Sequence, residues 1–296
     1  MLFLYSIILA GYKRGYCLSM QKINFTFSII FLFCFPQTVL SQQNKYETIT
    51  NLSYYSNSIN QTDEYISERC VVDMYYPKNI ENFPTVIWFH GGGLTGGEKE
   101  IPKALKEKGF CVVAANYRLS PKVKSPEYIK DAAAAVAWVF KNIKDYGGDT
   151  SLIFVSGYSA GGYLIKMIGL DKKWLAVHDV DADNIAGLIS FSGQAITHFT
   201  IREERGIPGT QPIVDELAPL YHVRKDAPPL ILITGDRELE LLGRYEENAY
   251  LMRMMKLNGH QKTKLYELDG YDHGIVDAAM PLLLKELNKI IHERKK

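Results

Sequence analysis

The chain has 296 residues, of which 34 are basic and 33 acidic, so its formal charge at neutral pH is +1. Hydrophobic residues make up 47% of the chain and charged residues 23%. This balance is typical of globular proteins and excludes disorder of the whole chain, because disorder requires low hydrophobicity and high net charge. The lack of a basic surplus argues against nucleic acid as the main ligand.

Residues 1–41 have the composition of a targeting segment, with three basic residues and no acidic one. From Met20, a short basic region precedes an apolar run at residues 23–35 and a cleavage-like sequence that ends at Ser41. This run of 13 residues is too short to cross a bilayer, which needs about 20. We therefore expect translation from Met20, cleavage near Ser41 and export to the periplasm or medium. A membrane anchor that also uses residues 2–10 is the alternative.

After a lead-in at residues 42–64, apolar runs rich in β-formers alternate with helical patterns. Strands are predicted at residues 70–75, 85–89, 111–115, 152–155, 185–191, 230–234 and 264–267. Helices are predicted at residues 101–108, 125–144, 161–169, 243–258 and 280–293. This alternation predicts an α/β fold, with a mostly parallel, twisted sheet and helices on both faces.

One segment interrupts the alternation within the predicted domain of residues 65–296. Residues 194–226 carry several glycines and prolines among charged side chains. A long irregular insert in a compact domain is usually functional. We expect a short lid or a wall of the substrate site there.

A G-Y-S-A-G motif at residues 157–161 follows the predicted strand 152–155 and precedes a predicted helix. This strand–turn–helix context is typical of a nucleophile elbow. The small Gly157 and Gly161 let the turn tighten, so that the hydroxyl of Ser159 projects beyond the strand. Ser159 is the predicted nucleophile.

A glycine run follows the predicted strand 85–89. Acyl transfer places negative charge on a carbonyl oxygen, and backbone N–H groups stabilise it where glycine lets the main chain approach closely. We expect Gly92 and Gly93, with the amide of Ala160, to form this oxyanion hole, and His90 and Gly91 to organise the loop. A phosphate-binding loop is disfavoured because no Gly-Lys-Ser/Thr follows.

The nucleophile needs a histidine as general base. Enzymes with this elbow place their partners in the order serine, acid, histidine. His273 lies in a short loop between the predicted strand 264–267 and the last helix, which fits that order. The remaining histidines after Ser159 precede the acid candidates or lie in surface or charged helical positions: His178, His198, His222, His260 and His292. His273 is therefore the predicted base.

The acid of the site is expected after the strand at residues 230–234. Asp236 and Glu238 both follow Gly235 there. Either carboxylate can receive the imidazole N–H and favour its charged form. The residues alone leave the two open.

Together these motifs resemble the α/β-hydrolase superfamily. More narrowly, they resemble esterases with an H-G-G-G loop, the hormone-sensitive-lipase-like and BD-FAE feruloyl-esterase-like carboxylesterases. The resemblance covers roughly residues 65–292 and includes N-Y-R-L-S-P at residues 116–121, Asp131 at the start of an alanine-rich helix, and Y-G-G-D at residues 146–149. It implies that the acid lies three residues after Gly235, which favours Glu238, although the family normally has Asp there.

The sequence thus predicts an exported serine hydrolase that cleaves carboxylic esters through an acyl-enzyme. The resemblance implies small acyl esters, such as acetyl or feruloyl groups on carbohydrate. An amidase, formamidase or peptidase with the same triad is one alternative, and a non-catalytic binding module of the same fold is another.

No cofactor and no metal are expected. The chain has no H-E-x-x-H or C-x-x-C motif, and the acidic stretch 179–184 lacks the glycine and glutamate of a calcium loop. The expected partner is a small-molecule or carbohydrate-linked ester, without nucleic acid and without a membrane span after cleavage. The sequence leaves open whether Cys70 and Cys111 pair.

Overall fold

A computed structural model describes residues 45–60 and 62–296. The predicted targeting segment and its cleavage site near Ser41 lie outside these residues. Within the described part, no helix is both long and apolar enough to cross a membrane. The described residues belong to a compact unit, Gln43–Lys296.

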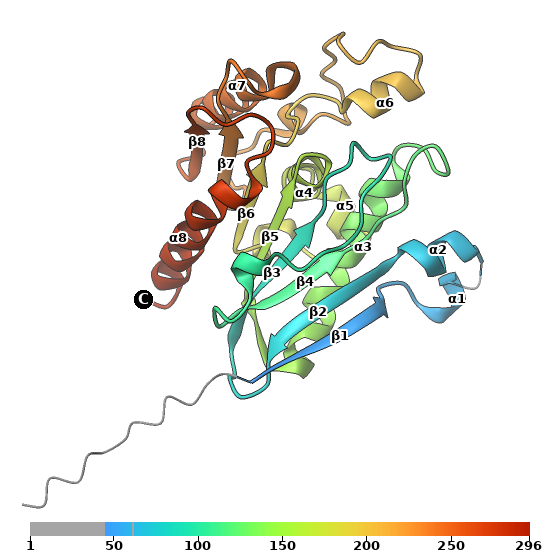
Figure 1. Cartoon of the computed structure of the whole chain (residues 1–296), viewed down its shortest axis with the longest axis vertical. Helices are drawn as coiled ribbons and strands as arrows, with labels where there is room; N and C mark the ends of the chain where they lie inside the picture. Colours follow the sequence, from blue (N-terminus) through green and yellow to red (C-terminus); the bar gives the residue numbers. More distant parts are fainter. Residues whose placement is uncertain (1–44, 61) are drawn as a thin grey trace, which may run out of the picture. The chain divides into compact units, whose positions relative to one another are not determined.

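An eight-stranded mixed sheet lies at the centre of the described residues (Figure 1). Its strands, in spatial order, are β1 (Tyr46–Ser53), β2 (Val71–Pro77), β4 (Cys111–Ala115), β3 (Phe83–Phe89), β5 (Gly148–Tyr158), β6 (Gly187–Phe191), β7 (Leu230–Gly235) and β8 (Thr263–Leu268). From β4 to β8 neighbouring strands run parallel, whereas β2 is antiparallel to both β1 and β4. The predicted α/β fold is confirmed.

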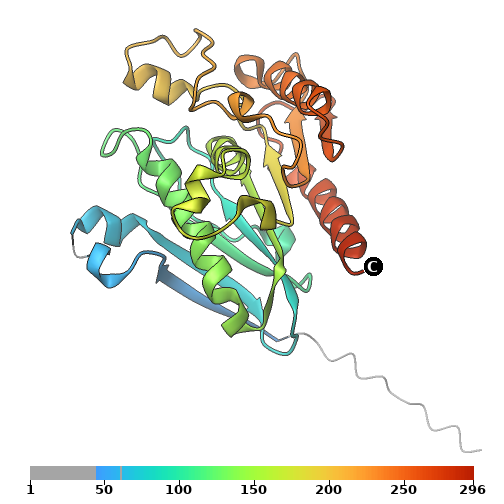
Figure 2. The same ribbon diagram turned by 180° about the vertical axis from the view of Figure 1, so that it is seen from behind.

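Helices cover both faces of this sheet (Figures 1 and 2). The α-helices of the described residues are α1 (Asn57–Asn60), α2 (Glu64–Arg69), α3 (Glu127–Asn142), α4 (Ala160–Leu170), α5 (Lys173–Ala176), α6 (Phe199–Glu204), α7 (Arg244–Leu257) and α8 (Val276–Arg294). Buried side chains of α3, α4 and α7 share one hydrophobic core, and those of α8 belong to a second core. The sheet separates the two cores.

The central parallel strands β3 and β7 are mostly apolar because both of their faces are covered. In β3, Val86 and Trp88 belong to the core with α8, whereas Ile87 and Phe89 belong to the core with α3 and α4. This alternation is the period of two expected of a strand. Full burial of each such aliphatic or aromatic side chain stabilises the fold by about 1.5–3 kcal/mol.

The register of the parallel strands brings their carboxyl ends to one edge of the sheet. Phe89 at the end of β3 lies opposite Gly157 in β5, and Gly157 lies opposite Ser190 in β6. Gly235 at the end of β7 lies opposite Leu268 in β8. The loops that follow these strands carry all the predicted site residues, so the register gathers them at that edge.

Two sequence-based expectations differ from the structure. Residues 101–108 form only one 3₁₀ turn, Lys103–Leu105, because Glu107 and Gly109 both adopt positive φ, which ends a right-handed helix. Residues 42–64, expected as a lead-in, contain β1, which pairs with β2. Its sequence is polar and mostly solvent-accessible, which hid it from a search for apolar runs.

Candidate active site

Ser159 lies in a tight turn between β5 and α4, as the elbow motif predicts. Its backbone has φ 52° and ψ −112°, a strained conformation of the kind found at functional sites. The turn needs its glycines: a Cβ on Gly157 would lie 2.6 Å from the carbonyl carbon of Gly161, and one on Gly161 would lie 2.2 Å from the carbonyl oxygen of Phe89. This close packing holds the serine beyond the strand end.

The structure brings Ser159, His273 and Glu240 into a hydrogen-bonded line. His273 Nε2 lies 3.0 Å from Ser159 Oγ, and His273 Nδ1 lies 2.5 Å from Glu240 Oε1. The Glu240 side chain is 1% exposed and that of His273 is 17% exposed. The arrangement has the geometry of a nucleophile, a general base and an orienting acid.

The expectation that Glu238 or Asp236 would be this acid is wrong. The Asp236 carboxylate accepts the backbone N–H groups of Glu238 and Gly270, and Glu238 is exposed. The chain turns back after β7, with the N–H of Glu240 donating to the carbonyl of Asp236 at 2.8 Å. That turn directs Glu240 toward the strand end, where its Oε2 accepts the N–H of Gly235 at 3.0 Å.

Glu240 is held in its charged form. Burial by itself raises the pKa of its carboxyl group, but hydrogen bonds from His273, Ser192 and the backbone N–H groups of Gly235 and Leu241 lower it to about 2. The Ser192 hydroxyl donates at 2.5 Å. A carboxylate fixed by this many donors orients the imidazole and stabilises its protonated form.

The predicted oxyanion loop follows β3. Gly92 and Gly93 have φ of 109° and 63°, and a Cβ on Gly92 would lie 2.2 Å from the carbonyl oxygen of Gly96. Glycine is therefore required for the loop to fold back on itself. Ala160 opens α4 directly after Ser159, so its amide is at the elbow as expected.

His90 organises this loop and does not contact the nucleophile. Its Nδ1 donates to the carbonyl of Gly91 at 2.6 Å, and its ring stacks on Tyr117 with centroids 4.5 Å apart. The Tyr117 hydroxyl donates to the carbonyl of His90 at 3.0 Å. Burial lowers the pKa of His90 to about 4, so it is neutral at pH 7.

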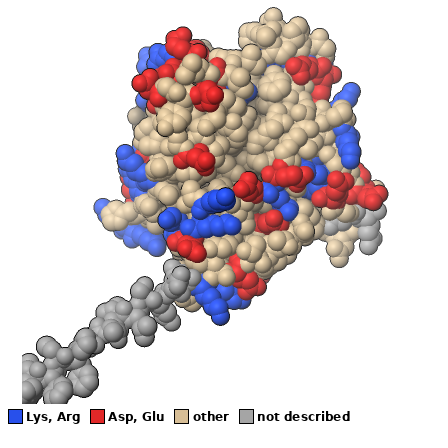
Figure 3. Space-filling view, in the orientation of Figure 1, with Lys and Arg blue, Asp and Glu red and all other residues tan. Residues whose placement is uncertain are grey.

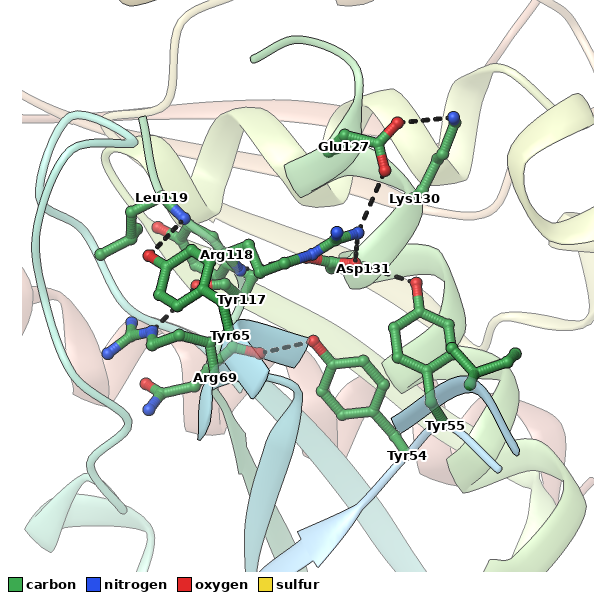
Figure 4. A network of polar contacts seen from close by, with 12 residues as sticks. Tyr54, Tyr55, Tyr65, Arg69, Tyr117, Arg118, Leu119, Glu127, Lys130 and Asp131 are labelled. Atoms are coloured by element: carbon green, nitrogen blue, oxygen red, sulfur yellow. Dashed lines mark hydrogen bonds and ion pairs between the residues drawn. The ribbon is translucent and has the colours of Figure 1, made fainter. Parts of the chain in front are cut away.

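Arg69, at the end of α2, lies beside Tyr117 (Figure 4) and connects it to Gly97, which packs against the loop. It donates to the carbonyl of Tyr117 at 3.2 Å and to that of Gly97 at 2.9 Å, and it pairs with Glu98. Gly97 packs against the loop so closely that a Cβ there would lie 2.3 Å from His90 Nδ1. The sequence analysis did not single out Arg69, because no motif surrounds it.

The N-Y-R-L-S-P segment and Asp131 meet in the same network (Figure 4). Arg118 donates to both carboxylate oxygens of Asp131 at 2.8 Å, a bidentate geometry that is strong when buried. Tyr55 donates to the same carboxylate at 2.9 Å. These residues tie the segment after β4 to α3, so they support the site without reaching the nucleophile.

The insert at residues 194–226 forms one wall beside the oxyanion loop. It contains α6 and the 3₁₀ turn Pro219–His222. The hydroxyl of Thr200 donates to the carbonyl of Gly93, and the ring of Phe199 lies 3.2 Å from where a Gly93 Cβ would be. The insert is thus packed onto the loop.

The other features raised by the sequence lie outside this site. Within residues 45–60 and 62–296, no group of three or more His, Cys, Asp or Glu side chains is arranged to hold a metal ion. Cys70 and Cys111 are both free and buried. Acidic and basic side chains are interspersed on the face drawn in Figure 3.

A model of the BD-FAE family matches residues 72–241, which is more than half of the chain. The chain belongs to the BD-FAE family. This confirms the resemblance inferred from the motifs.

The curated relatives of this BD-FAE member include proteins named as esterases. The probable carboxylic ester hydrolase LipM of Mycobacterium tuberculosis is 28% identical over 51% of this chain and 40% of its own length. Esterase LipC of the same organism is 25% identical over 64% of this chain and 51% of its own length. The chain therefore spans about half, or less, of the length of these relatives.

Solved structures share the fold. A truncated carbohydrate esterase from gut microbiota aligns with a TM-score of 0.68 and 19% identity, over 86% of this chain and 99% of that one. Esterase 2 of Thermogutta terrifontis, solved after phosphoramylation by tabun, aligns with a TM-score of 0.63 and 20% identity, over 84% of this chain and 96% of that one. These likenesses establish the α/β-hydrolase fold.

Proposed function

We propose that this BD-FAE member is a serine hydrolase that cleaves carboxylic esters through an acyl-enzyme on Ser159. The single observation that carries the proposal is the line of contacts from Ser159 Oγ through His273 to Glu240, at 3.0 and 2.5 Å. The esterase names of its relatives support the same class of reaction.

In the first half of the proposed reaction, Ser159 Oγ attacks the ester carbonyl carbon while His273 Nε2 accepts the hydroxyl proton. The carbonyl oxygen gains negative charge, and the N–H groups of Gly92, Gly93 and Ala160 stabilise it. One such donor contributes about 3–4 kcal/mol in a studied protease. The imidazolium then donates its proton to the leaving alcohol, and the acyl group remains on the serine.

The second half repeats these steps with water. His273 Nε2 takes a proton from the water, whose oxygen attacks the acyl carbon, and the proton passes to Ser159 Oγ as the acid leaves. Glu240 keeps the imidazole proton on Nδ1 throughout, which leaves Nε2 free to accept. All of these proton transfers use residues of the chain itself.

We propose small acyl groups, acetyl or feruloyl, on carbohydrate as the substrate class. The family match and the likeness to a solved carbohydrate esterase support this choice. We further propose that the protein is exported after cleavage near Ser41, on the strength of the pattern at residues 1–41. Amino-terminal sequencing of the protein from its host tests export, since an intact Met1 or Met20 would contradict it.

The proposed reaction is tested by release of p-nitrophenol from p-nitrophenyl acetate, butyrate and octanoate. We expect the purified chain to turn over the short esters and Ser159→Ala to be inactive. Ser151→Ala, at an exposed position on β5, is the matched control and should retain activity. A fluorophosphonate should add its mass to the peptide that contains Ser159. A folded chain that hydrolyses none of these esters and is not labelled would overturn the proposal.

A further inference from the structure

A cavity is lined in part by the insert, whose helix α6 also contacts the predicted oxyanion loop. Its volume is ≈ 450 Å³, within the range of about 300–1,000 Å³ that small-molecule sites occupy. Residues from three segments line it: Lys124 to Pro126 after β4, Lys173 and Trp174 in α5, and Glu204, Arg205, Glu216 and Leu217 of the insert. None of the residues of the catalytic line is among them.

Three residues that line this cavity have a buried polar atom without a partner in the described structure: Trp174 Nε1, Glu204 Oε1 and Ser125 Oγ. The indole Nε1 of Trp174 makes no hydrogen bond, although the residue is nine-tenths buried. The Glu204 Oε1 atom is also buried and unpartnered, whereas Oε2 accepts the N–H of Ser125 at 2.9 Å. Leaving such groups unpaired costs the protein their desolvation without a compensating bond. A ligand that supplies both an acceptor and a donor would relieve this cost.

The charges around the cavity disfavour an anionic ligand. Lys173 is already paired with Asp171 at 2.9 Å, and Arg205 is paired with Asp215 at 2.5 Å. Of the other charged residues that line the cavity, Lys124 is basic, whereas Glu204 and Glu216 are acidic. An anionic ligand would find no surplus of positive charge there.

We propose that this cavity binds a neutral saccharide. A hydroxyl group donates and accepts hydrogen bonds with the same oxygen, so a sugar can accept from the indole N–H of Trp174 and donate to Glu204. A peptide amide also offers both functions. The choice of sugar over peptide rests on the proposed function, in which the substrate is a carbohydrate ester.

The helix α6 connects the cavity to the proposed active site. The first residues of α6, Phe199 and Thr200, contact Gly93, and its last residue, Glu204, lines the cavity. At a rise of 1.5 Å per residue this six-residue helix spans about 9 Å. That length is on the scale of a disaccharide, so the cavity would hold a sugar unit of an extended substrate while its ester lies at Ser159.

Calorimetric titration of the Ser159→Ala chain with xylobiose, cellobiose, glucuronic acid and a capped dipeptide tests the site without any turnover. We expect saturable binding of at least one of the two disaccharides. Trp174→Phe and Glu204→Gln should each weaken it about five- to tenfold, because Trp174→Phe removes the indole donor and Glu204→Gln replaces a charged acceptor with a neutral amide. Two matched controls, Trp138→Phe in α3 and Glu203→Gln beside Glu204, should bind within about twofold of the parent.

The proposal is overturned if neither disaccharide binds, if glucuronic acid or the dipeptide binds in preference, or if all four variants weaken binding equally. Should Trp174→Phe fail to fold, Glu204→Gln carries the test. In chains with Ser159 intact, Trp174→Phe should raise KM for acetylated xylobiose and leave p-nitrophenyl acetate unaffected. If the unmutated chain does not hydrolyse p-nitrophenyl acetate, the proposed function is refuted. The titration would still decide whether the cavity binds a sugar.

Discussion

Glu240 provides the sharpest test of the site, because the family resemblance favours Glu238 whereas the structure places Glu240 against His273. Glu240→Gln keeps the size of the side chain and removes its charge. The wild-type carboxylate accepts from His273 Nδ1 at 2.5 Å, from Ser192 Oγ at 2.5 Å and from Gly235 N at 3.0 Å. A glutamine has one acceptor oxygen, so its NH₂ group must face a donor.

If that NH₂ group faces His273, the imidazole must carry its proton on Nε2 and cannot accept the proton of Ser159. The same change of tautomer lowers kcat about 10⁴-fold in a serine protease, and removal of the acid costs about 3 × 10⁴ in another. We expect Glu240→Gln to lower kcat about 10³–10⁴-fold, which corresponds to about 4–5.5 kcal/mol of transition-state stabilisation. KM should change little, because the carboxylate does not line the substrate site directly.

The assay is the initial rate of p-nitrophenyl acetate hydrolysis at neutral pH, with circular dichroism to confirm that each variant is folded. Glu238→Gln is the matched control, since it makes the same chemical change two residues away at an exposed position. Its kcat should stay within about threefold of wild type. The reasoning fails if Glu240→Gln keeps its activity while Glu238→Gln loses it.

Three further predictions follow from the same structure. Arg69→Met should lower kcat about 10- to 100-fold with little change in KM, because it releases the carbonyl of Gly97 behind the oxyanion loop. Arg224→Met is the matched control, because it removes similar hydrogen bonds to the carbonyls of Leu170 and Gly169, and its kcat should stay within about twofold of wild type. Equal losses of kcat in the two variants would argue for a merely structural role of Arg69. Burial lowers the pKa of His90 from 6.5 to about 4. The buried neutral imidazole therefore contributes its full stabilisation above pH 6.5, and about 3 kcal/mol of the free energy of unfolding is lost as the pH falls from 6.5 through 4. Urea unfolding at a series of pH values measures this loss. His90→Gln should make it smaller, and a variant whose stability depends on pH as in the wild type would disprove the assignment to His90. Burial also raises the pKa of the Cys70 and Cys111 thiols, so peptide mapping should find them unmodified by a thiol reagent until the protein is denatured, and rapid labelling of either in the folded chain would count against their burial.

Much of the fold was predictable because its determinants are local. Apolar runs such as those of β3 and β7 are buried on both faces, and that burial leaves a continuous signal in the sequence. The strand β1 gave no such signal, since its few apolar side chains are separated by polar ones and it is defined by pairing with β2. Pairing between strands is a property of the folded sheet.

By itself, the sequence determined the parts of the site that depend on backbone shape. Gly157, Gly161 and Gly92 lie where a Cβ would collide with the main chain. The elbow and the predicted oxyanion loop could therefore be recognised from glycines at fixed positions in the sequence. His273 was predicted from the sequence by another route, because among the histidines it alone combined the expected chain order with a loop position after a strand.

Only the tertiary structure decided which acid meets His273 and what holds the oxyanion loop in place. Three carboxylates lie within five residues after Gly235, and a backbone turn from Asp236 to Glu240 selects the last of them. Arg69 reaches Tyr117 and Gly97 across 48 and 28 residues of sequence. Such contacts leave no local pattern, because they depend on how separate segments pack at the edge of the sheet.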